Sequence, residues 1–278
     1  MRLVLSKVLP PISELVNVSE IEKKVKTFST MELLREYGSR KSKVELVTPQ
    51  NISQYSLPRD LVKGGRLIIL EYYKIPRNTV AASYLPEFMV CPLRIYNMRK
   101  LGELLKGEDY MVKIYTLDNV RKLLIGTMLH EEYLRDIEVI YSEYKVITEV
   151  LVEKEFDNGV KLIGRCDIIG VHNDKLFIAE VKRRYKSKYF WQVAAYGYCL
   201  GVKRLYIVDV DKCVKLPTFD EVVMEKIIRR YVLIENAKDE NELIKSVTDD
   251  HLKMCKKCIY TFICPVFRSR RKRITDFV

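Results

Sequence analysis

Apolar and polar positions form their clearest pattern in the middle of the chain, where two apolar segments flank a short polar turn. The segments are GRCDIIG (Gly164–Gly170) and LFIAEVKRR (Leu176–Arg184), and Asn173-Asp174 lies between them. Both segments are rich in β-branched residues, so the pattern predicts a β-hairpin with a two-residue turn. In the register that such a turn imposes, Asp167 lies directly opposite Glu180.

The surrounding pattern predicts helices and strands in the order αβββαβ. Apolar residues recur at helical spacing in Asp118–Ile137, and Lys145–Phe156 is typical of a strand that precedes the hairpin. Lys188–Gly201 predicts a helix that ends at its glycine, and Arg204–Val210 predicts a further strand. This order predicts an α/β fold in which helices flank a mixed sheet.

Outside this core the chain is expected to carry appended parts. Residues 1–79 are predicted to form an N-terminal extension, and residues 80–278 a domain whose core spans about 116–216. Thr218-Phe219-Asp220-Glu221 is a capping box that predicts a helix toward Ala237. The other predicted elements are helices over Ser13–Lys26, Met31–Tyr37 and 83–100, strands at Val44–Val47 and Leu67–Tyr72, and a loop over Asn51–Gly65.

The predicted hairpin brings three charged side chains together. Side chains two apart in a strand share a face, so Glu180 and Lys182 point the same way as Asp167, and Val181 points into the core. Two close carboxylates repel each other unless a cation lies between them, and oxygen ligands suit Mg²⁺ or Mn²⁺. The alternative is a solvated strand edge, but the apolar run Leu176–Ala179 is typical of a central strand.

This D…E-x-K arrangement resembles the restriction-endonuclease-like nucleases, in which Asp167, Glu180 and Lys182 would be catalytic. Gln192 and Tyr196 share a helix face and resemble the Q-x-x-x-Y motif with which the RecB-like branch contacts DNA. Without that position after E-x-K, an ordinary amphipathic helix would explain them.

A second part of the same resemblance concerns metal ligands. His130 ends the sequence G-T-M-L-H, and RecB-like enzymes with a G-x-x-x-H helix use that histidine as a metal ligand. The resemblance also implies the main-chain carbonyl of Val181 as a ligand, beside Asp167 and Glu180. An isolated histidine on a helix surface is the alternative, and an imidazole ligand would favour Mn²⁺ over Mg²⁺.

Cysteines form a second group. Cys255, Cys258 and Cys264 have the spacing C-x₂-C-x₅-C, and Cys91 is the candidate fourth ligand because proline follows both Cys91 and Cys264. Four thiolates suit zinc or an iron–sulfur cluster, and spacing alone leaves both open. The three remaining cysteines are two buried small hydrophobes and one of undetermined role, namely Cys166, Cys199 and Cys213.

One cysteine before and three after the nuclease motifs resemble the CRISPR-associated exonuclease family of the Cas-four type, and the iron–sulfur nuclease domains of AddB-like helicase–nucleases. The stretch from Ser83 to Tyr96 is similar to that family's N-terminal cluster motif. The resemblance covers about residues 80–270. It implies a RecB-like nuclease domain closed by an iron–sulfur cluster, [4Fe–4S] in preference to [2Fe–2S], and the CRISPR integrase and other adaptation proteins as partners.

Composition agrees with a nucleic-acid enzyme of the cytoplasm. The net charge of +12 suits a polyanion, no apolar run reaches membrane-spanning length, and an odd number of cysteines favours metal binding over disulfides. The charged fraction of 31%, with few glutamines, favours a thermophilic source.

Basic and aromatic residues interleave after the site, with Arg183, Arg184 and Lys186 as candidate DNA-binding residues. A basic tail, Arg268–Arg273, ends the chain either in contact with DNA or frayed.

The sequence therefore predicts a metal-dependent DNA exonuclease, a hydrolase that prefers single-stranded or splayed ends, and the family resemblance implies that it prepares DNA for CRISPR spacer acquisition. A RecB-like repair nuclease unconnected to CRISPR, a non-enzymatic iron–sulfur or zinc adaptor that binds DNA, and a nuclease directed at RNA are the alternatives.

Overall fold

A computed structural model describes residues 8–40, 44–55, 57–140, 146–245, 247, 255 and 258–267. The chain divides into two compact units. The first comprises Met1–Leu33, Val80–Pro86 and Arg121–Ile228, and the second comprises Leu34–Thr79, Glu87–Val120 and Arg229–Val278. Each unit takes segments from both sides of residue 79. A functional division into an extension and a nuclease domain stays a prediction.

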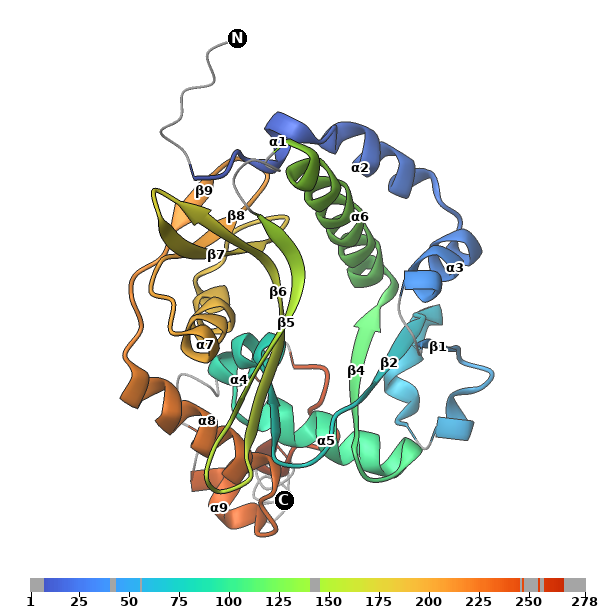
Figure 1. Ribbon diagram of the computed structural model, residues 1–278. Coiled ribbons are helices and arrows are strands. Elements are labelled where there is room, and N and C mark those ends of the chain that lie inside the picture. The colour runs from blue at the N-terminus through green and yellow to red at the C-terminus, as the bar shows by residue number, and fades with distance from the viewer. Residues whose placement is uncertain are drawn as a thin grey trace. The chain divides into compact units, whose positions relative to one another are not determined.

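The first unit is built on a mixed sheet (Figure 1). The strands follow the path β3-β6-β7-β8-β9, and β5 pairs with β6 beside that path. The β5–β6, β6–β7 and β8–β9 pairs are antiparallel and the β7–β8 pair is parallel, which confirms the predicted mixed sheet. The strands are β3 (Thr79–Ala81), β5 (Ile147–Glu155), β6 (Lys161–His172), β7 (Lys175–Val181), β8 (Leu205–Val208) and β9 (Cys213–Lys215).

Two helices flank this sheet, as the sequence predicts. They are α6 (Leu117–Ile140), most of which belongs to the first unit, and α7 (Phe190–Leu200), which packs against β5, β6, β7 and β8. Helix α7 ends at Gly201, whose φ of 67° is the left-handed conformation that glycine adopts without strain. The observed order α6-β5-β6-β7-α7-β8 confirms the predicted αβββαβ order.

The N-terminal helix of this unit is interrupted, so the continuous helix predicted over Ser13–Lys26 is wrong in its extent. Helix α1 (Ile12–Leu15) stops before Asn17, and α2 (Val18–Thr27) begins after it. The side chain of Asn17 accepts a hydrogen bond from the backbone N–H of Glu20 at 3.2 Å, which caps the new helix.

The second unit contains a three-stranded antiparallel sheet in the order β1-β2-β4, and α5 packs on β4. One helix was expected over 83–100, but α4 ends before Cys91 and α5 begins after Pro92. Proline lacks an N–H and disfavours a helical conformation in the residue before it, so Cys91 lies at a break. These elements are β1 (Val44–Val47), β2 (Ile68–Lys74), β4 (Tyr110–Thr116), α4 (Leu85–Val90) and α5 (Leu93–Lys106).

The capping box predicted at Thr218 is also corrected. The side chain of Asp220 accepts hydrogen bonds from the N–H groups of Val222 and Val223, at 2.7 and 3.1 Å, so Asp220 caps α8 (Glu221–Glu235).

The loop expected over Asn51–Gly65 contains two short 3₁₀ helices. The remaining elements are α3 (Thr30–Arg40), η1 (Ile52–Tyr55), η2 (Arg59–Gly65), η3 (Ala82–Tyr84), η5 (Ser187–Tyr189) and α9 (Glu240–Lys245).

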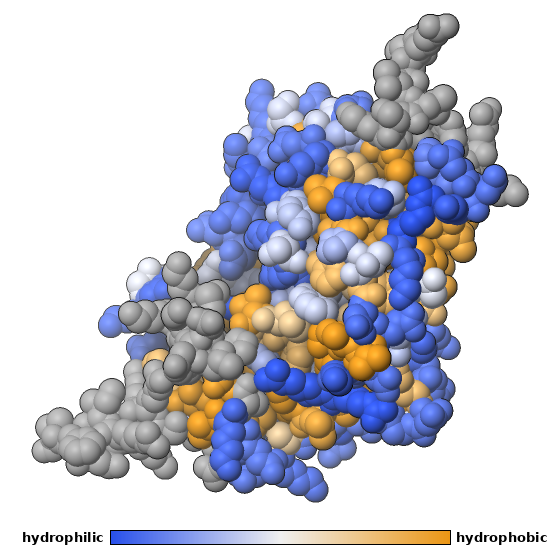
Figure 2. Space-filling view, turned by 90° about the vertical axis from the view of Figure 1, so that its left-hand side faces the viewer, coloured by the Kyte–Doolittle hydropathy of each residue, from blue (hydrophilic) through white to orange (hydrophobic). Residues whose placement is uncertain are grey.

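Two expected features lie outside the described residues: Lys145, which begins a predicted strand, and the basic tail Arg268–Arg273. Within the described ranges, no helix has the length and apolar character that a membrane crossing requires. Figure 2 shows one face on which exposed hydrophobic side chains lie among hydrophilic ones.

Two helical glycines provide a test of the packing of α5. A Cβ added to Gly102 would lie 1.9 Å from the carbonyl oxygen of Tyr110, whereas a Cβ at Gly126 meets nothing closer than 4.0 Å. Gly102→Ala should therefore destabilise the protein by about 1–3 kcal/mol, because a backbone atom must move. Gly126→Ala should stabilise it by about 0.5–1 kcal/mol through helix propensity alone. Denaturant melts of both variants measure the difference, and equal stabilities would contradict the packing.

Candidate active site and cysteine cluster

The β6–β7 hairpin has the predicted register. Asn173 and Asp174 have φ values of 51° and 55°, as a two-residue turn of this kind requires. The paired positions run from His172–Lys175 to Ile168–Ala179, and the next position places Asp167 opposite Glu180. Both carboxyl groups are buried, with residue exposures of 7% and 1%. The sequence therefore brings two carboxylates together inside the sheet.

Asp167 is held in place by two donors. The backbone N–H of Val181 donates to its Oδ2 at 2.7 Å, and Nε2 of His130 on α6 lies 3.2 Å from its Oδ1. Burial alone would raise the pKa of Asp167, but the hydrogen bond and the charge of His130, together with Lys182, hold it below its usual range. Asp167 is thus an anion in the folded protein.

Glu180 is in a different position, because only one of its oxygens has a partner. Its Oε1 accepts hydrogen bonds from Lys182 and from the amide of Gln192, the latter at 2.7 Å, whereas its buried Oε2 has no partner among the described residues. Burial and the nearby charge of Asp167 raise the pKa of Glu180 well above its usual range. A buried carboxylate oxygen without a partner is costly, and a bound cation would satisfy it.

Lys182 remains an ammonium. Burial would lower its pKa, but the charges of Glu180 and Asp167 raise it above the ordinary value for lysine. The side chain is therefore a hydrogen-bond donor and a fixed positive charge beside the carboxylates.

A third carboxylate near His130 belongs to Glu149 on β5. His130 Nε2 lies 3.4 Å from Oε1 of Glu149, and donor atoms of His130, Glu149 and Asp167 all lie within 4.8 Å of one another. Burial would lower the pKa of His130, but its hydrogen bond with Asp167 and the neighbouring carboxylates raise it. Glu149 has a φ of 53°, which is strained for a non-glycine residue, and such strain often occurs at functional sites.

These donors fit a divalent cation. An octahedral Mg²⁺ or Mn²⁺ with bonds of about 2.1 Å places neighbouring donors roughly 3 Å apart, close to the 3.2 and 3.4 Å separations around His130. Glu180 lies near enough to His130 and Asp167 to interact with both electrostatically, and one of its buried oxygens has no partner among the described residues. The residues that could hold the cation are therefore His130, Glu149, Asp167 and Glu180. Whether the carbonyl of Val181 also contributes stays a prediction.

Sequence reasoning missed Glu149, although the sequence held a signal for it. The turn Asp157-Asn158-Gly159 pairs Phe156 with Val160, and the backbone N–H of Phe156 donates to Val160 at 2.9 Å. Continuing that register down the β5–β6 hairpin leads to the pairs flanking Glu149 and Asp167, which therefore face each other. Applying the hairpin register twice would have found this residue.

Gln192 and Tyr196 were expected to contact DNA, but both side chains are buried in the protein. The amide of Gln192 donates to Tyr196 at 2.6 Å as well as to Glu180. The Tyr196 ring lies over Gly164, where any Cβ would come within 2.4 Å of it. The pair thus orients Glu180 from α7, and its contact with DNA stays a prediction.

The three basic residues after the site differ in their surroundings. Arg183 forms an ion pair with Glu22 of α2, whereas Arg184 and Lys186 are exposed. Exposed cations can contact the phosphates of DNA, but none of the described contacts assigns that role to Arg184 or Lys186.

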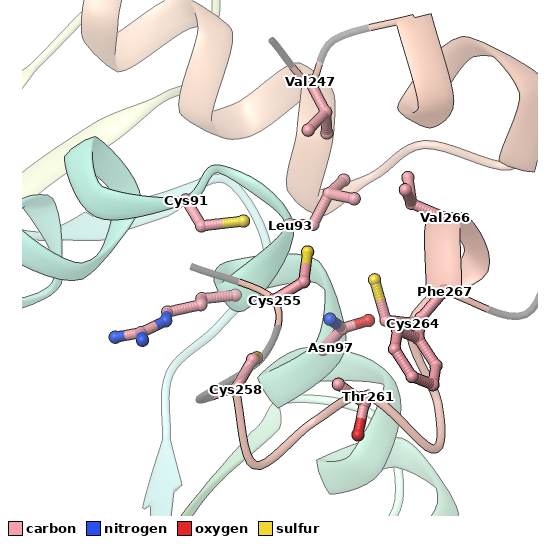
Figure 3. Close-up of a pocket in the computed structure, with 11 residues that line it drawn as sticks. Cys91, Leu93, Asn97, Val247, Cys255, Cys258, Thr261, Cys264, Val266 and Phe267 are labelled. Carbon is pink, nitrogen blue, oxygen red and sulfur yellow. The ribbon is translucent and has the colours of Figure 1, made fainter. Parts of the chain in front are cut away.

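The four cysteines predicted to act together line one cavity of the second unit (Figure 3). Cys91 reaches it from the break between α4 and α5, and Cys255, Cys258 and Cys264 reach it from the C-terminal segment. The other three cysteines belong to the first unit and do not line this cavity: Cys166, which is buried, and the half-buried Cys199 and Cys213.

Several donors surround the sulfur atoms. The backbone of Leu93 and the backbone of Tyr260 lower the pKa of the Cys91 and Cys258 thiols respectively, and the Arg94 guanidinium lowers the pKa of both. Burial raises the pKa of the Cys91 thiol to about 11, so these donors oppose the effect of burial. Donors of this kind stabilise thiolates, the form in which cysteine binds a metal.

Comparisons with known proteins give similarity in structure only. No protein-family model matches the chain, and no curated protein matches it in sequence. Among solved structures, the crystal structure of SSO0001 is 20% identical with a TM-score of 0.46, covering 70% of this chain and 89% of that one.

An alkaline exonuclease, LHK-Exo from Laribacter hongkongensis, is 18% identical with a TM-score of 0.41, covering 65% of this chain and 95% of that one. The same enzyme in complex with dAMP is 19% identical with a TM-score of 0.40, covering 65% and 93%. All three resemble the chain over part of its length, and the function proposed below rests on the site geometry.

Binding of Mn²⁺ to the proposed site at His130, Glu149, Asp167 and Glu180 should stabilise the folded protein. At a concentration 100 times its dissociation constant, a ligand adds about 2.7 kcal/mol to the free energy of unfolding. In thermal melts, added Mn²⁺ should raise the Tm of the wild type. It should also raise the Tm of the control Glu153→Gln, which changes an exposed residue on β5, the strand that carries Glu149. Asp167→Asn should abolish the rise and Glu149→Gln should reduce it. A full Mn²⁺-induced rise in the Asp167 variant would exclude this site.

Proposed function

We propose that this chain is a divalent-metal-dependent deoxyribonuclease that hydrolyses phosphodiester bonds from DNA ends. The observation that carries the proposal is the convergence of Asp167 and Glu180 beside His130 and Lys182, with one buried oxygen of Glu180 left unsatisfied. Carboxylates that converge around a divalent ion, next to a fixed ammonium, are suited to phosphoryl transfer to water. Most buried carboxylate oxygens have a hydrogen-bond partner, so this oxygen beside Asp167, His130 and Lys182 is suited to a bound cation.

Each side chain has a distinct task in this proposal. His130, Asp167 and Glu180 hold Mn²⁺ or Mg²⁺, with Glu149 beside them and the carbonyl of Val181 as the further ligand that the family resemblance implies. A cation bound there lowers the pKa of a water molecule and offsets charge on the scissile phosphate.

Lys182 contributes a positive charge where negative charge develops on the phosphate. Its ammonium donates a hydrogen bond to Glu180, which fixes that charge beside the carboxylates. Gln192 and Tyr196 fix the orientation of Glu180, and we propose that the same helix face guides the DNA strand once a substrate is bound.

The proposed substrate is DNA with a single-stranded or splayed end. The net charge of +12 favours a polyanion, and the segment that leaves β7 carries exposed Arg184 and Lys186 with aromatic residues between and after them. Such a mixture can contact phosphates and stack unpaired bases.

We also propose that the four-cysteine cavity holds an iron–sulfur cluster, of the [4Fe–4S] type. The cavity offers four thiols, and neighbouring backbone groups and Arg94 lower the pKa of two of them, which favours the thiolate form. Hydrogen bonds to thiolate sulfurs are a recurrent feature that tunes such clusters. Zinc is the alternative occupant, since it binds four thiolates equally well.

Together these features lead us to propose membership of the Cas-four type of CRISPR-associated exonucleases, with a RecB-like core over about 116–216. The corresponding role is the preparation of DNA for spacer acquisition, in contact with the CRISPR integrase, in the cytoplasm. Residues 1–79 are an addition to that family's usual pattern. The motif order H…D…E-x-K…Q-x-x-x-Y with one cysteine before it and three after it supports this proposal.

Cleavage assays on end-labelled DNA with Mn²⁺ test the proposed chemistry. The wild type should shorten single strands and splayed duplexes faster than a blunt duplex. Glu180→Ala should abolish cleavage, and Lys182→Ala should slow it by about 10²–10³-fold, because a positive charge that stabilises the transition state is lost. Glu153→Gln, in the same sheet, is the control and should cut normally. Cleavage by a folded Glu180→Ala protein at the wild-type rate would refute the assignment.

Metal analysis of anaerobically purified protein tests the cysteine cavity. The wild type should be coloured and contain iron, and Cys91→Ala should lose the colour and melt at a lower temperature, because the metal no longer links distant parts of the chain. Cys199→Ala is the matched control and should keep both properties. Stoichiometric zinc in a colourless wild type would replace the cluster with zinc, and full colour in Cys91→Ala would remove Cys91 from the ligand set.

A further inference from the structure

An exposed apolar residue and an exposed cation lie beside the carboxylate group on the β5–β6 hairpin. In that hairpin Leu151 pairs with Arg165, one same-face step from Glu149 and Asp167. Same-face neighbours along a strand are about 6.8 Å apart. Leu151 and Arg165 therefore lie on the face that carries the proposed metal ligands, within one nucleotide's reach of them.

Both side chains extend into solvent. Leu151 is 71% exposed, and the Arg165 side chain is 69% exposed while it forms an ion pair with Glu149 at 3.1 Å. A single exposed leucine needs no explanation in itself. This leucine is notable because its cross-strand partner is a cation that already touches a carboxylate of the site, and half-buried Ile163 continues the apolar surface at the next same-face step.

We propose that Leu151 and Arg165 hold the unpaired nucleotide next to the cut, with its base against Leu151 and its phosphate against Arg165. This inference rests on the proposed nuclease function and adds a substrate-binding surface to it. The occupant follows from charge and shape together. Arg165 is complementary to a phosphate, and an aliphatic side chain is suited to contact the face of a base that has left its stack.

The arrangement has a consequence for strand selection. In a blunt duplex the bases are stacked and paired, so Leu151 has no base face to contact unless the end opens. A single strand or a splayed end offers that face at no cost. A second copy of this chain is a poorer occupant, because two proteins of charge +12 repel each other.

Fluorescence anisotropy without added divalent cation, so that the DNA stays intact, tests the surface. A labelled single strand and a blunt duplex of equal length are titrated with the wild type, Leu151→Ser and Leu176→Ser. Leu176 is the matched control, because it is 52% exposed on β7 of the same sheet and belongs to no proposed site. Leu151→Ser should weaken single-strand binding by about three- to tenfold, the effect of losing one apolar contact, and should leave duplex binding unchanged. Leu176→Ser should match the wild type on both substrates.

Two further measurements separate the contributions. Arg165→Gln should reduce the slope of log affinity against log salt by about 0.7 for a single strand, because one phosphate contact is lost, and Arg165→Lys should restore most of it. A 2-aminopurine at the DNA end should brighten when the wild type binds and unstacks it, and should stay dim with Leu151→Ser.

The possible failures are distinguishable. If the wild type binds DNA but Leu151→Ser binds a single strand equally well, this surface is refuted and the nuclease proposal stands. Equal losses in Leu151→Ser and Leu176→Ser also refute it, since the effect would then be general. A wild type that binds neither DNA would refute the proposed function together with the surface.

Discussion

The close approach of Asp167 and Glu180 is the constraint on which the rest of the site depends. Two carboxyl groups face each other across adjacent strands with almost no solvent around them. Their mutual repulsion and their desolvation both disfavour the charged state. The surrounding groups oppose that effect. The Val181 N–H and His130 stabilise the charge of Asp167, and Lys182 stabilises the charge of Glu180. One oxygen of Glu180 has no partner in the described part of the chain, and we propose that a bound cation satisfies it.

The elements around the carboxylates are arranged to keep them in register. The turn at Asn173-Asp174 sets the β6–β7 pairing, and α7 reaches down to Glu180 through Gln192. On the opposite carboxylate, α6 supplies His130. The precision of this geometry comes from regular strands and helices and not from loops, so the donors are positioned before any metal binds. Such preorganisation lowers the free-energy cost of assembling the site during a reaction.

Much of this could be predicted from residues that interact locally. A two-residue turn and alternating side chains are enough to place Asp167 opposite Glu180, because hairpin register depends on the turn alone. The positions of Gln192 and Tyr196 on one helix face were equally accessible, but their burial was not, since it depends on how α7 packs on the sheet. Glu149 was missed because the register argument was applied to one hairpin and not to its neighbour.

Features that depend on distant parts of the chain were the hardest to predict. Each unit is built from three separate segments of the chain, and no local sequence pattern marks where the chain passes from one unit to the other. The break between helices at Cys91 was missed because the effect of Pro92 was not weighed against an otherwise helical pattern. Capping of α8 by Asp220 in place of Thr218 shows the same limit on a smaller scale, because neighbouring residues compete for one helix start.

The central claim is that the buried carboxylates form a divalent-cation site, and anomalous diffraction from crystals soaked in Mn²⁺ tests it most directly. The account predicts one anomalous peak or more about 2.0–2.3 Å from oxygens of Asp167 and Glu180 and from Nε2 of His130. Density that is absent there in crystals soaked to saturation, or that lies only at surface carboxylates elsewhere, would contradict the account.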